Sequence, residues 1–289
     1  EGSRMFIQEG TKVRLEDILR GIIVQSGNDA SVALAEHVAG SEEGFADVMN
    51  QYAQQLGMTD TNFVNATGLP DENHYTTAND LARLTVALIN QFPEHYKIYS
   101  EKYFKYNNIN QPNRNRLLWR DSSVDGLKTG HTNAAGYCLV SSAKRRDMRL
   151  ISVVMGADSD KARARETQKL LSYGFRHYDT KTIYSAGDIL KENAKVWYGE
   201  EGFLNLTIAE NVTLTLPRGA QKELSANILV DEQIKAPIAA GQELGRLQVS
   251  LNDEILIDTA LVAEKDIAQS GLFSRFVDWI LLFITQLMS

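Results

Sequence analysis

The sequence predicts an α/β (α+β) domain, then a small all-β, sandwich-like domain and a C-terminal amphipathic helix. Up to about Tyr178, segments with helical apolar spacing are combined with three strand-like segments. Beyond Tyr178 the chain changes to short strands broken by turns, with no long helical segment before Leu272. The predicted domains are therefore residues 1–178, 179–265 and 266–289.

Four helices are predicted in the first part of the chain. Apolar residues recur at helical spacing over residues 13–23, and this pattern breaks at Gly27. Ser26, Gly27 and Asn28 are therefore expected in a tight connection between helices. The other helices span 29–38, 42–56 and 77–89, and Gly40 supplies a left-handed cap for the first of these. Residues 62–76, rich in Asn, Gly, Pro and Asp, are expected to form an irregular loop.

Three strands and a further helix complete this predicted domain. Residues 125–132 are polar and contain glycine, which is typical of a short exposed strand. Residues 135–143 and 150–155 are apolar or β-branched enough for core strands, and helical spacing returns at 162–173. Lys128, Thr129 and Gly130 are thus expected at the edge of a sheet.

Composition limits the classes of partner. The 289-residue chain has a formal net charge of −7 and a pI near 5.4, which argues against a phosphate-binding surface. We therefore expect no nucleic acid partner. The single cysteine, Cys138, cannot close an intrachain disulfide, and no signal peptide is recognisable at the N-terminus.

Two short motifs point to a chemistry. Ser26-Gly27-Asn28 and Lys128-Thr129-Gly130 match two of the three active-site elements of penicillin-recognising serine hydrolases. Longer segments around them, and the order of the three predicted parts, resemble the low-molecular-mass penicillin-binding proteins that act as D-alanyl-D-alanine carboxypeptidases. The segments that carry this resemblance are 20–30, 113–119, 124–132 and 149–156.

The resemblance implies acyl transfer. A serine would attack the D-Ala-D-Ala bond of a peptidoglycan stem peptide, the terminal D-alanine would leave, and water would hydrolyse the acyl-enzyme. β-Lactam antibiotics would bind covalently to the intact protein. No cofactor is implied. Because His74 and His131 have no partners at metal-ligand spacing, no metal site is predicted either.

The resemblance also assigns roles to residues. Ser26 would relay a proton toward the leaving amine, and Asn28 would hold the substrate amide. Lys128 and Thr129 would bind the terminal carboxylate of the substrate. Gly130 would keep the strand edge bare for the substrate backbone, and the N–H of His131 would complete the oxyanion hole.

Two arginines are further candidates for substrate binding. Arg163 matches a family position that holds the substrate carboxylate, while a salt bridge on the face of its helix is an equal alternative. We expect Arg114 to be mainly structural and to brace the loop that precedes Lys128.

The third family element, Ser-x-x-Lys before Ser26, is not found in the sequence. We expect this element to lie in a segment that precedes Glu1, and we expect the chain as given to be inactive by itself. A Ser-x-x-Lys sequence does occur at Ser141–Lys144, but its order relative to Lys128 is wrong. Residues 201–205 resemble a deacylation element of β-lactamases, again in the wrong order. We interpret both as accidental.

Two alternative functions remain open: a non-catalytic peptidoglycan-binding homologue and, with less support, a β-lactamase. Experiments on D-alanine release and penicillin turnover would separate them. A β-lactamase is disfavoured by the β-rich domain, by the terminal helix and by the lack of a correctly placed deacylating glutamate.

The last predicted helix suggests a membrane surface as a partner. One face of residues 272–288 is apolar, and Trp279 lies among these side chains, as in helices that lie in a membrane interface. Docking on its own domain is the alternative. Asp278 leaves an uncharged run of only about ten residues, which is too short to cross a bilayer. We expect peripheral anchoring at the periplasmic side of the bacterial inner membrane. The apolar face comprises Phe273, Phe276, Val277, Ile280, Phe283, Ile284 and Leu287.

Overall fold

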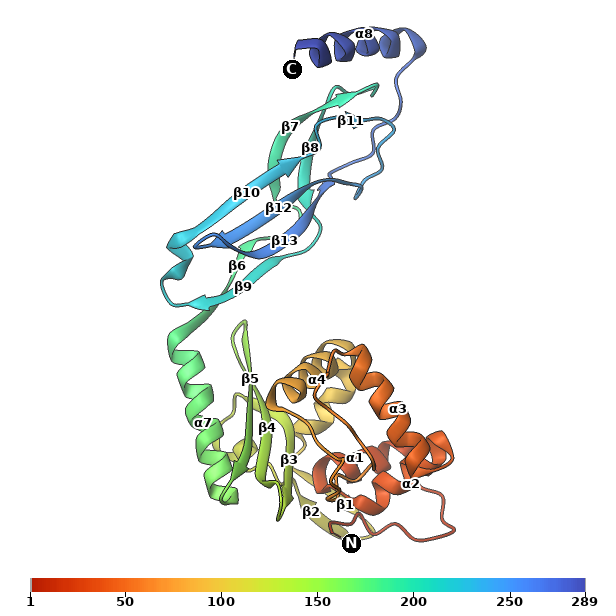
Figure 1. Cartoon of the computed structure of the whole chain (residues 1–289), viewed down its shortest axis with the longest axis vertical. Coiled ribbons are helices and arrows are strands. Elements are labelled where there is room, and N and C mark those ends of the chain that lie inside the picture. Colours follow the sequence, from red (N-terminus) through yellow and green to blue (C-terminus); the bar gives the residue numbers. More distant parts are fainter. Residues whose placement is uncertain (1, 289) are drawn as a thin grey trace. The chain divides into compact units, whose positions relative to one another are not determined.

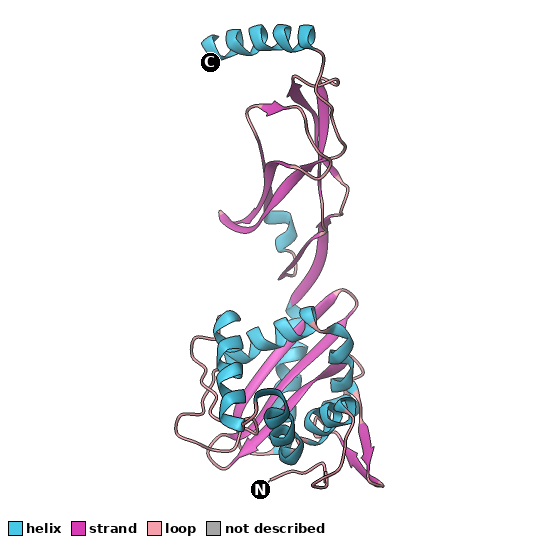
Figure 2. Cartoon of the chain, turned by 90° about the vertical axis from the view of Figure 1, so that its right-hand side faces the viewer, coloured by secondary structure: helices cyan, strands magenta, loops and turns pink. Residues whose placement is uncertain are grey.

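The computed structural model describes residues 2–288. The chain forms two compact units, Glu1–Arg176 and His177–Ser289 (Figure 1). In the first unit, a sheet lies between a long helix, α7 (Asp160–His177), and a group of helices on its other face (Figures 1 and 2). The second unit is built mainly of strands.

The helices of the first unit begin and end close to the predicted positions. Ser26 ends the first helix in a left-handed conformation, and Gly40 ends the second in the same way. Ser41 and Thr77 each accept a hydrogen bond from an amide of the first turn that follows, which caps the third and fourth helices. These helices are α1 (Leu15–Gln25), α2 (Asn28–Ala39), α3 (Glu42–Gln55) and α4 (Ala78–Gln91), followed by the short α5 (Pro93–Tyr96) and η1 (Lys97–Ser100).

The three expected strands form one antiparallel sheet in the order β3-β4-β5. Strand β3 (Val124–Thr132) is an edge of this sheet, which confirms the expected position of Lys128-Thr129-Gly130. Strand β4 (Gly136–Arg145) has a run of buried residues, 139–143, as predicted for a core strand. Strand β5 (Met148–Ala157) is mostly half-buried, and β3 is more buried than the exposed strand that the sequence predicted. The connection before β3 contains elements that the sequence did not predict: the hairpin β1 (Tyr103–Tyr106) and β2 (Ile109–Pro112), and the short helix α6 (Leu117–Arg120).

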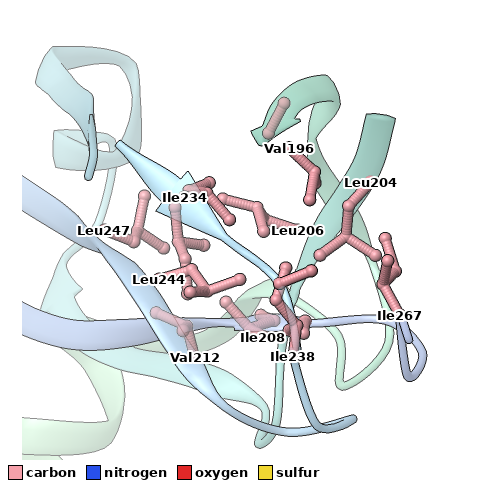
Figure 3. Packing of buried hydrophobic residues seen from close by; sticks show 14 of the residues in the cluster. Val196, Leu204, Leu206, Ile208, Val212, Ile234, Ile238, Leu244, Leu247 and Ile267 are labelled. Atoms are coloured by element: carbon pink, nitrogen blue, oxygen red, sulfur yellow. The ribbon is translucent and has the colours of Figure 1, made fainter. Parts of the chain in front are cut away.

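The second unit contains a six-stranded sheet and a two-stranded ribbon. The sheet has the order β10-β12-β13-β8-β7-β11, and β6 pairs with β9. The core of the second unit is a cluster of aliphatic side chains that pack against one another (Figure 3). Leu206, Leu247 and Leu261 in this cluster are fully buried. The strands are β6 (Tyr178–Tyr184), β7 (Ile189–Trp197), β8 (Phe203–Ile208), β9 (Val212–Pro217), β10 (Leu224–Val230), β11 (Ile234–Lys235), β12 (Glu243–Leu251) and β13 (Glu254–Ala263).

The C-terminal helix, α8 (Leu272–Met288), contacts the β-rich part of its own unit by a narrow stripe. A carboxylate oxygen of Asp278 accepts a 2.7 Å hydrogen bond from the backbone N–H of Tyr198, and Leu282, one turn later, is 8% exposed. Most other apolar side chains of the helix up to residue 284 are exposed, including Phe276, Trp279 and Phe283. Among the residues that the structure describes, no helix is both long enough and apolar enough to span a bilayer.

Candidate active site

A pocket of about 990 Å³ lies in the first unit, between the α1–α2 connection and the edge strand β3. Other parts of its wall come from the loop before α6 and from the start of α7. All eight predicted site residues contribute to its lining: Ser26, Asn28, Arg114, Lys128, Thr129, Gly130, His131 and Arg163. The structure therefore brings together residues that are distant in the sequence.

Ser26 is placed by an unusual backbone conformation. Its φ angle is +61°, a left-handed value that side-chain-bearing residues seldom adopt. The two amides at this helix end are satisfied, because Ser26 N–H donates to the carbonyl of Ile22 and Gly27 N–H donates to the carbonyl of Gly21. The turn directs the hydroxyl toward β3, where it meets the side chain of Lys128. A conformation of this kind at a pocket is consistent with a functional constraint.

Asn28 begins α2, and the next residue fastens the N-terminal segment to the site. The carboxylate of Asp29 accepts hydrogen bonds from the N–H groups of Met5 and Phe6, both at 2.8 Å, and from that of Ile7 at 3.2 Å. The N–H of Asn28 donates to the carbonyl of Ser3 at 2.8 Å. These bonds hold an extended segment, without a helix or strand, beside the site, and its first residues, Gly2 and Ser3, line the pocket.

Lys128 joins the two sides of the pocket. Its Nζ atom hydrogen-bonds to Ser26 Oγ and donates a 2.9 Å bond to the carbonyl oxygen of Thr129. Burial of the ammonium group, together with the nearby positive charges of Arg114 and Arg163, lowers the pKa of Lys128 to about 8. The charge of this lysine therefore changes near neutral pH, whereas an exposed lysine would remain charged.

The edge of β3 presents backbone groups to the pocket. Since the carbonyl of Thr129 accepts from Lys128 Nζ, it points away from β4. In an antiparallel ladder the N–H and C=O of one residue face the same side, and the side alternates along the strand. The N–H of His131, two residues further, therefore also faces the open edge.

Gly130 is not required by the fold itself. Its φ angle is not in the left-handed region, and a Cβ atom built there would lie 3.8 Å from the nearest neighbour, Cys138, which is an ordinary contact. The fold therefore has room for a small side chain here, and the role of Gly130 in keeping the edge bare for a ligand stays a prediction.

Arg163 is buried, and its guanidinium is engaged by protein oxygen atoms. Nη2 donates to a carboxylate oxygen of Asp160 at 2.6 Å, while Nη1 donates to the carbonyl oxygens of Gly130 at 2.9 Å and Cys138 at 3.3 Å. The sequence left open whether Arg163 forms a salt bridge within its helix or binds the substrate carboxylate. The structure contains a salt bridge within the helix, to Asp160, but it is buried and not the solvated one that the sequence suggested.

The expectation that Arg114 braces the loop before Lys128 is wrong. Arg114 is exposed in the pocket, and the bracing comes from its two neighbours, which are buried. Asn115 donates from Nδ2 to the carbonyl of Gly126 at 3.0 Å, and its Oδ1 accepts from the N–H of Leu117. Asn113 donates to the carbonyl of Glu101 at 3.0 Å. Amides can donate and accept toward backbone groups, whereas a guanidinium only donates.

The sequence prediction missed other contributors to the site. Trp119 lines the pocket, is 40% exposed and packs edge-on against Tyr103 with ring centroids 5.7 Å apart. Asp160 also lines the pocket and pairs with Arg163, three residues later in α7. That i, i+3 spacing of opposite charges was the available signal for the pair.

The two motif matches interpreted as accidental have structural roles. Ser141 is fully buried in β4, and its hydroxyl donates a 2.9 Å hydrogen bond to the carbonyl of Gly126. It cannot meet a substrate in the pocket. Glu201 lies in the second unit, where its carboxylate forms an ion pair with Lys265.

His74 and His131 take part in local contacts of the first unit. The ring of His131 lies against that of Tyr137 at a tilt of 36°, with centroids 4.0 Å apart, and His74 Nδ1 accepts a hydrogen bond from the N–H of Val64. Burial lowers the pKa of His74. Within residues 2–288 there is no cluster of three or more His, Cys, Asp or Glu side chains able to hold a metal ion.

Comparisons with known proteins agree with this geometry. Residues 1–159 match the family of D-alanyl-D-alanine carboxypeptidases, and residues 178–269 match the C-terminal domain of penicillin-binding protein 5. The chain is 44% identical to the D-alanyl-D-alanine carboxypeptidase DacC of Escherichia coli, over 97% of this chain and 70% of that protein. It is 42% identical to DacA of Haemophilus influenzae, over 100% of this chain and 74% of that protein.

A solved structure shows the same fold. Penicillin-binding protein 5 from Haemophilus influenzae superposes with a TM-score of 0.81 at 43% identity, covering 93% of this chain and 79% of that one. The family match covers more than half of the chain, and the identities to the two relatives extend over nearly all of it. The chain belongs to the family of serine-type D-alanyl-D-alanine carboxypeptidases.

Proposed function

We propose that the pocket binds the D-Ala-D-Ala end of a peptidoglycan stem peptide along β3, and that it is also the site at which β-lactams bind. The observation that carries this proposal is the contact between Lys128 Nζ and Ser26 Oγ across the pocket, beside an open strand edge. A cation, a hydroxyl and the backbone of the open strand edge then face the same space. They suit a ligand with an extended backbone and a terminal carboxylate.

Each residue has a role in this proposal. Protonated Lys128 attracts the terminal carboxylate, to which Thr129 adds its hydroxyl. Exposed Arg114 adds a second cation in the pocket. The open edge at Gly130 admits the peptide backbone, Asn28 holds its amide, and the N–H of His131 stabilises the oxyanion that forms on the attacked carbonyl.

The chemical step is that of the family. A serine hydroxyl attacks the carbonyl of the penultimate D-alanine and forms an ester. The C–N bond breaks, and Ser26 passes a proton to the leaving amine, so that D-alanine departs as the free amino acid. Water then hydrolyses the ester, which restores the serine and leaves a stem peptide one residue shorter.

Binding to this chain tests the proposal directly. Calorimetry should detect an acylated peptide ending in D-Ala-D-Ala, and the C-terminal amide of the same peptide should bind at least about tenfold more weakly, since it lacks the charge that Lys128 attracts. A peptide ending in L-Ala-L-Ala is the stereochemical control. Equal affinity for acid and amide would overturn the proposed orientation. The two reactions are tested on a longer chain that carries the Ser-x-x-Lys element. There, rapid penicillin turnover without D-alanine release would instead identify a β-lactamase, and binding without either reaction a non-catalytic peptidoglycan-binding protein.

We further propose three functional parts: a catalytic domain at residues 1–178, a β-rich domain at 179–265 and a membrane-anchoring helix at 266–289. The division between the two compact units and the separate family matches support the first boundary. The partner of the third part would be a membrane surface, with the protein held at the periplasmic side of the bacterial inner membrane.

The exposed face of α8 supports the membrane proposal. The rings of Phe276, Trp279 and Phe283 stack in a row, each 6.1 Å from the next, and are 53% to 58% exposed. Since Asp278 and Leu282 fix the opposite stripe to the β-rich part, this row is held outward. A helix held in this way suits insertion into one leaflet parallel to the surface.

A further inference from the structure

Arg163 contacts the peptide unit that carries the proposed oxyanion donor. The carbonyl of Gly130 and the N–H of His131 belong to one planar peptide group, in which the two point in opposite directions. Arg163 Nη1 donates to that carbonyl at 2.9 Å from the β4 side. The N–H of His131 consequently faces the open edge.

Arg163 also fastens β3 to β4 at this point. The carbonyl of Cys138, which lies opposite Gly130 in the ladder, accepts from the same Nη1 at 3.3 Å. The guanidinium carbon lies 5.5 Å from the ring centroid of Tyr137, and that ring lies against the ring of His131. Arg163 thus contacts the backbone of the Gly130–His131 peptide directly, and it contacts the side chain of His131 through the ring of Tyr137.

Asp160 holds the guanidinium in place. One carboxylate oxygen accepts from Arg163 Nη2 at 2.6 Å, and the other lies 2.8 Å from Nε of Arg116 as an ion pair. Arg163 is 6% exposed, so its charge needs such a partner within the protein. With Nη2 bound to Asp160, Nη1 points at the strand.

We propose that Arg163 and Asp160 are positioning residues for the oxyanion donor: the guanidinium orients and polarises the Gly130–His131 peptide, and Asp160 fixes the guanidinium. A cation at the carbonyl oxygen strengthens the dipole of the whole peptide group, which makes the N–H on the other side a better donor. The inference rests on the proposed role of the His131 N–H. In this inference Arg163 does not contact the substrate carboxylate directly. The carboxylate is bound by Lys128 and Thr129.

The first test needs no ligand. In the full 289-residue chain, R163M and D160N should each shift the amide resonance of His131 in a ¹H–¹⁵N NMR spectrum, and R163K should restore part of the shift because it keeps a charged donor. R165M and E166Q are the matched controls, since Arg165 and Glu166 form an exposed ion pair on the same helix. An unchanged His131 resonance in a folded R163M protein would overturn the inference. If R163M does not fold, the His131 resonance in D160N and R163K provides the test of the inference.

The second test separates positioning from direct carboxylate binding. The affinity ratio between the D-Ala-D-Ala peptide and its C-terminal amide is measured for the unmodified chain and for R163M. Positioning predicts that the ratio remains within about twofold, because Lys128 still supplies the charge discrimination. A fall of the ratio to near one would show that Arg163 binds the carboxylate itself. If neither peptide binds the unmodified chain, the proposed function fails, while the NMR test still reports on the peptide group.

Discussion

Lys128 Nζ hydrogen-bonds to Ser26 Oγ although the two residues are 102 positions apart in the chain. The lysine comes from an edge strand and the serine from a connection between two helices. Their contact closes the pocket at one point and places a titrating cation beside a hydroxyl.

The affinity for a D-Ala-D-Ala peptide should fall as the pH rises through about 8, the pKa of Lys128 in the folded protein. Below this value the ammonium attracts the carboxylate; above it the amine is neutral. A bound carboxylate favours the protonated form, so binding near pH 8 should also take up protons, which calorimetry in buffers of different ionisation enthalpy detects. K128M should bind weakly and lose this pH dependence. The same pH profile in K128M would assign the titration to another group.

Substitution of Ser26 should separate the hydroxyl from the backbone conformation. S26A and S26G both remove the hydroxyl, and both should weaken peptide binding if Ser26 contacts the ligand. S26G should nevertheless be the more stable of the two by about 1 kcal/mol, because glycine adopts a left-handed φ without steric cost. Urea denaturation measures this difference. Equal stability of the two variants would mean that the conformation at residue 26 carries no strain.

Fluorescent penicillin should leave the 289-residue chain unlabelled on a denaturing gel. The one Ser-x-x-Lys sequence starts at Ser141, which is fully buried and donates its hydroxyl to the carbonyl of Gly126. Boiled protein and an active penicillin-binding protein serve as negative and positive controls. If labelling occurs, mass spectrometry of the labelled peptide identifies the serine, and a label on Ser141 would contradict its structural role.

N115A should destabilise the protein by about 1–3 kcal/mol, because it leaves the buried N–H of Leu117 without its partner and removes one of the two donors to the carbonyl of Gly126, which keeps only Ser141 Oγ. R114A, next to it in the sequence, should change stability by less than about 0.5 kcal/mol, since Arg114 is an exposed side chain. Denaturant unfolding of both variants checks the contrast. Comparable losses in the two would restore a bracing role for Arg114.

Replacement of Phe276, Trp279 and Phe283 by serine should abolish flotation with phospholipid vesicles, as should deletion of residues 271–289. Serine replacements at Ile189, Phe203 and Ile255, which are exposed apolar residues elsewhere in the second unit, form the control and should not affect flotation. The charged residues in the sequence of α8 are Arg275 and Asp278, so binding should depend little on salt. Unchanged vesicle binding after the deletion would refute the anchor.

The sequence predicted the fold where a local signal was strong. Gly40 and the helical spacing of apolar residues placed the first helices within two or three residues, and the apolar strands around Cys138 and Val153 were recognisable from composition. The hairpin at residues 103–112 was missed because each strand has only four residues, too few for a clear alternation.

The positions of the motif residues in the site were predicted from the sequence, but the surroundings of the two arginines were not. The motif residues of β3 and the α1–α2 connection lie where expected, because short motifs in tight turns and edge strands have few possible positions. The surroundings of Arg114 and Arg163 depend on which oxygen atoms the tertiary structure brings near them. Nothing local in the sequence shows that Asn115, and not Arg114, turns inward, or that the carbonyl of Gly130 reaches Arg163.

The segment 3–7, whose first residue Ser3 lines the pocket, is held almost entirely through its main chain. Asp29 binds its amides, the N–H of Asn28 binds the carbonyl of Ser3, and Gln111 binds that of Arg4. Such contacts are indifferent to side-chain identity, with buried Met5 as the exception. The residues that bind this backbone, Asp29, Asn28 and Gln111, thus set where Ser3 lies at the pocket. Exposed side chains further along the segment can therefore be exchanged without moving the backbone that lines the pocket.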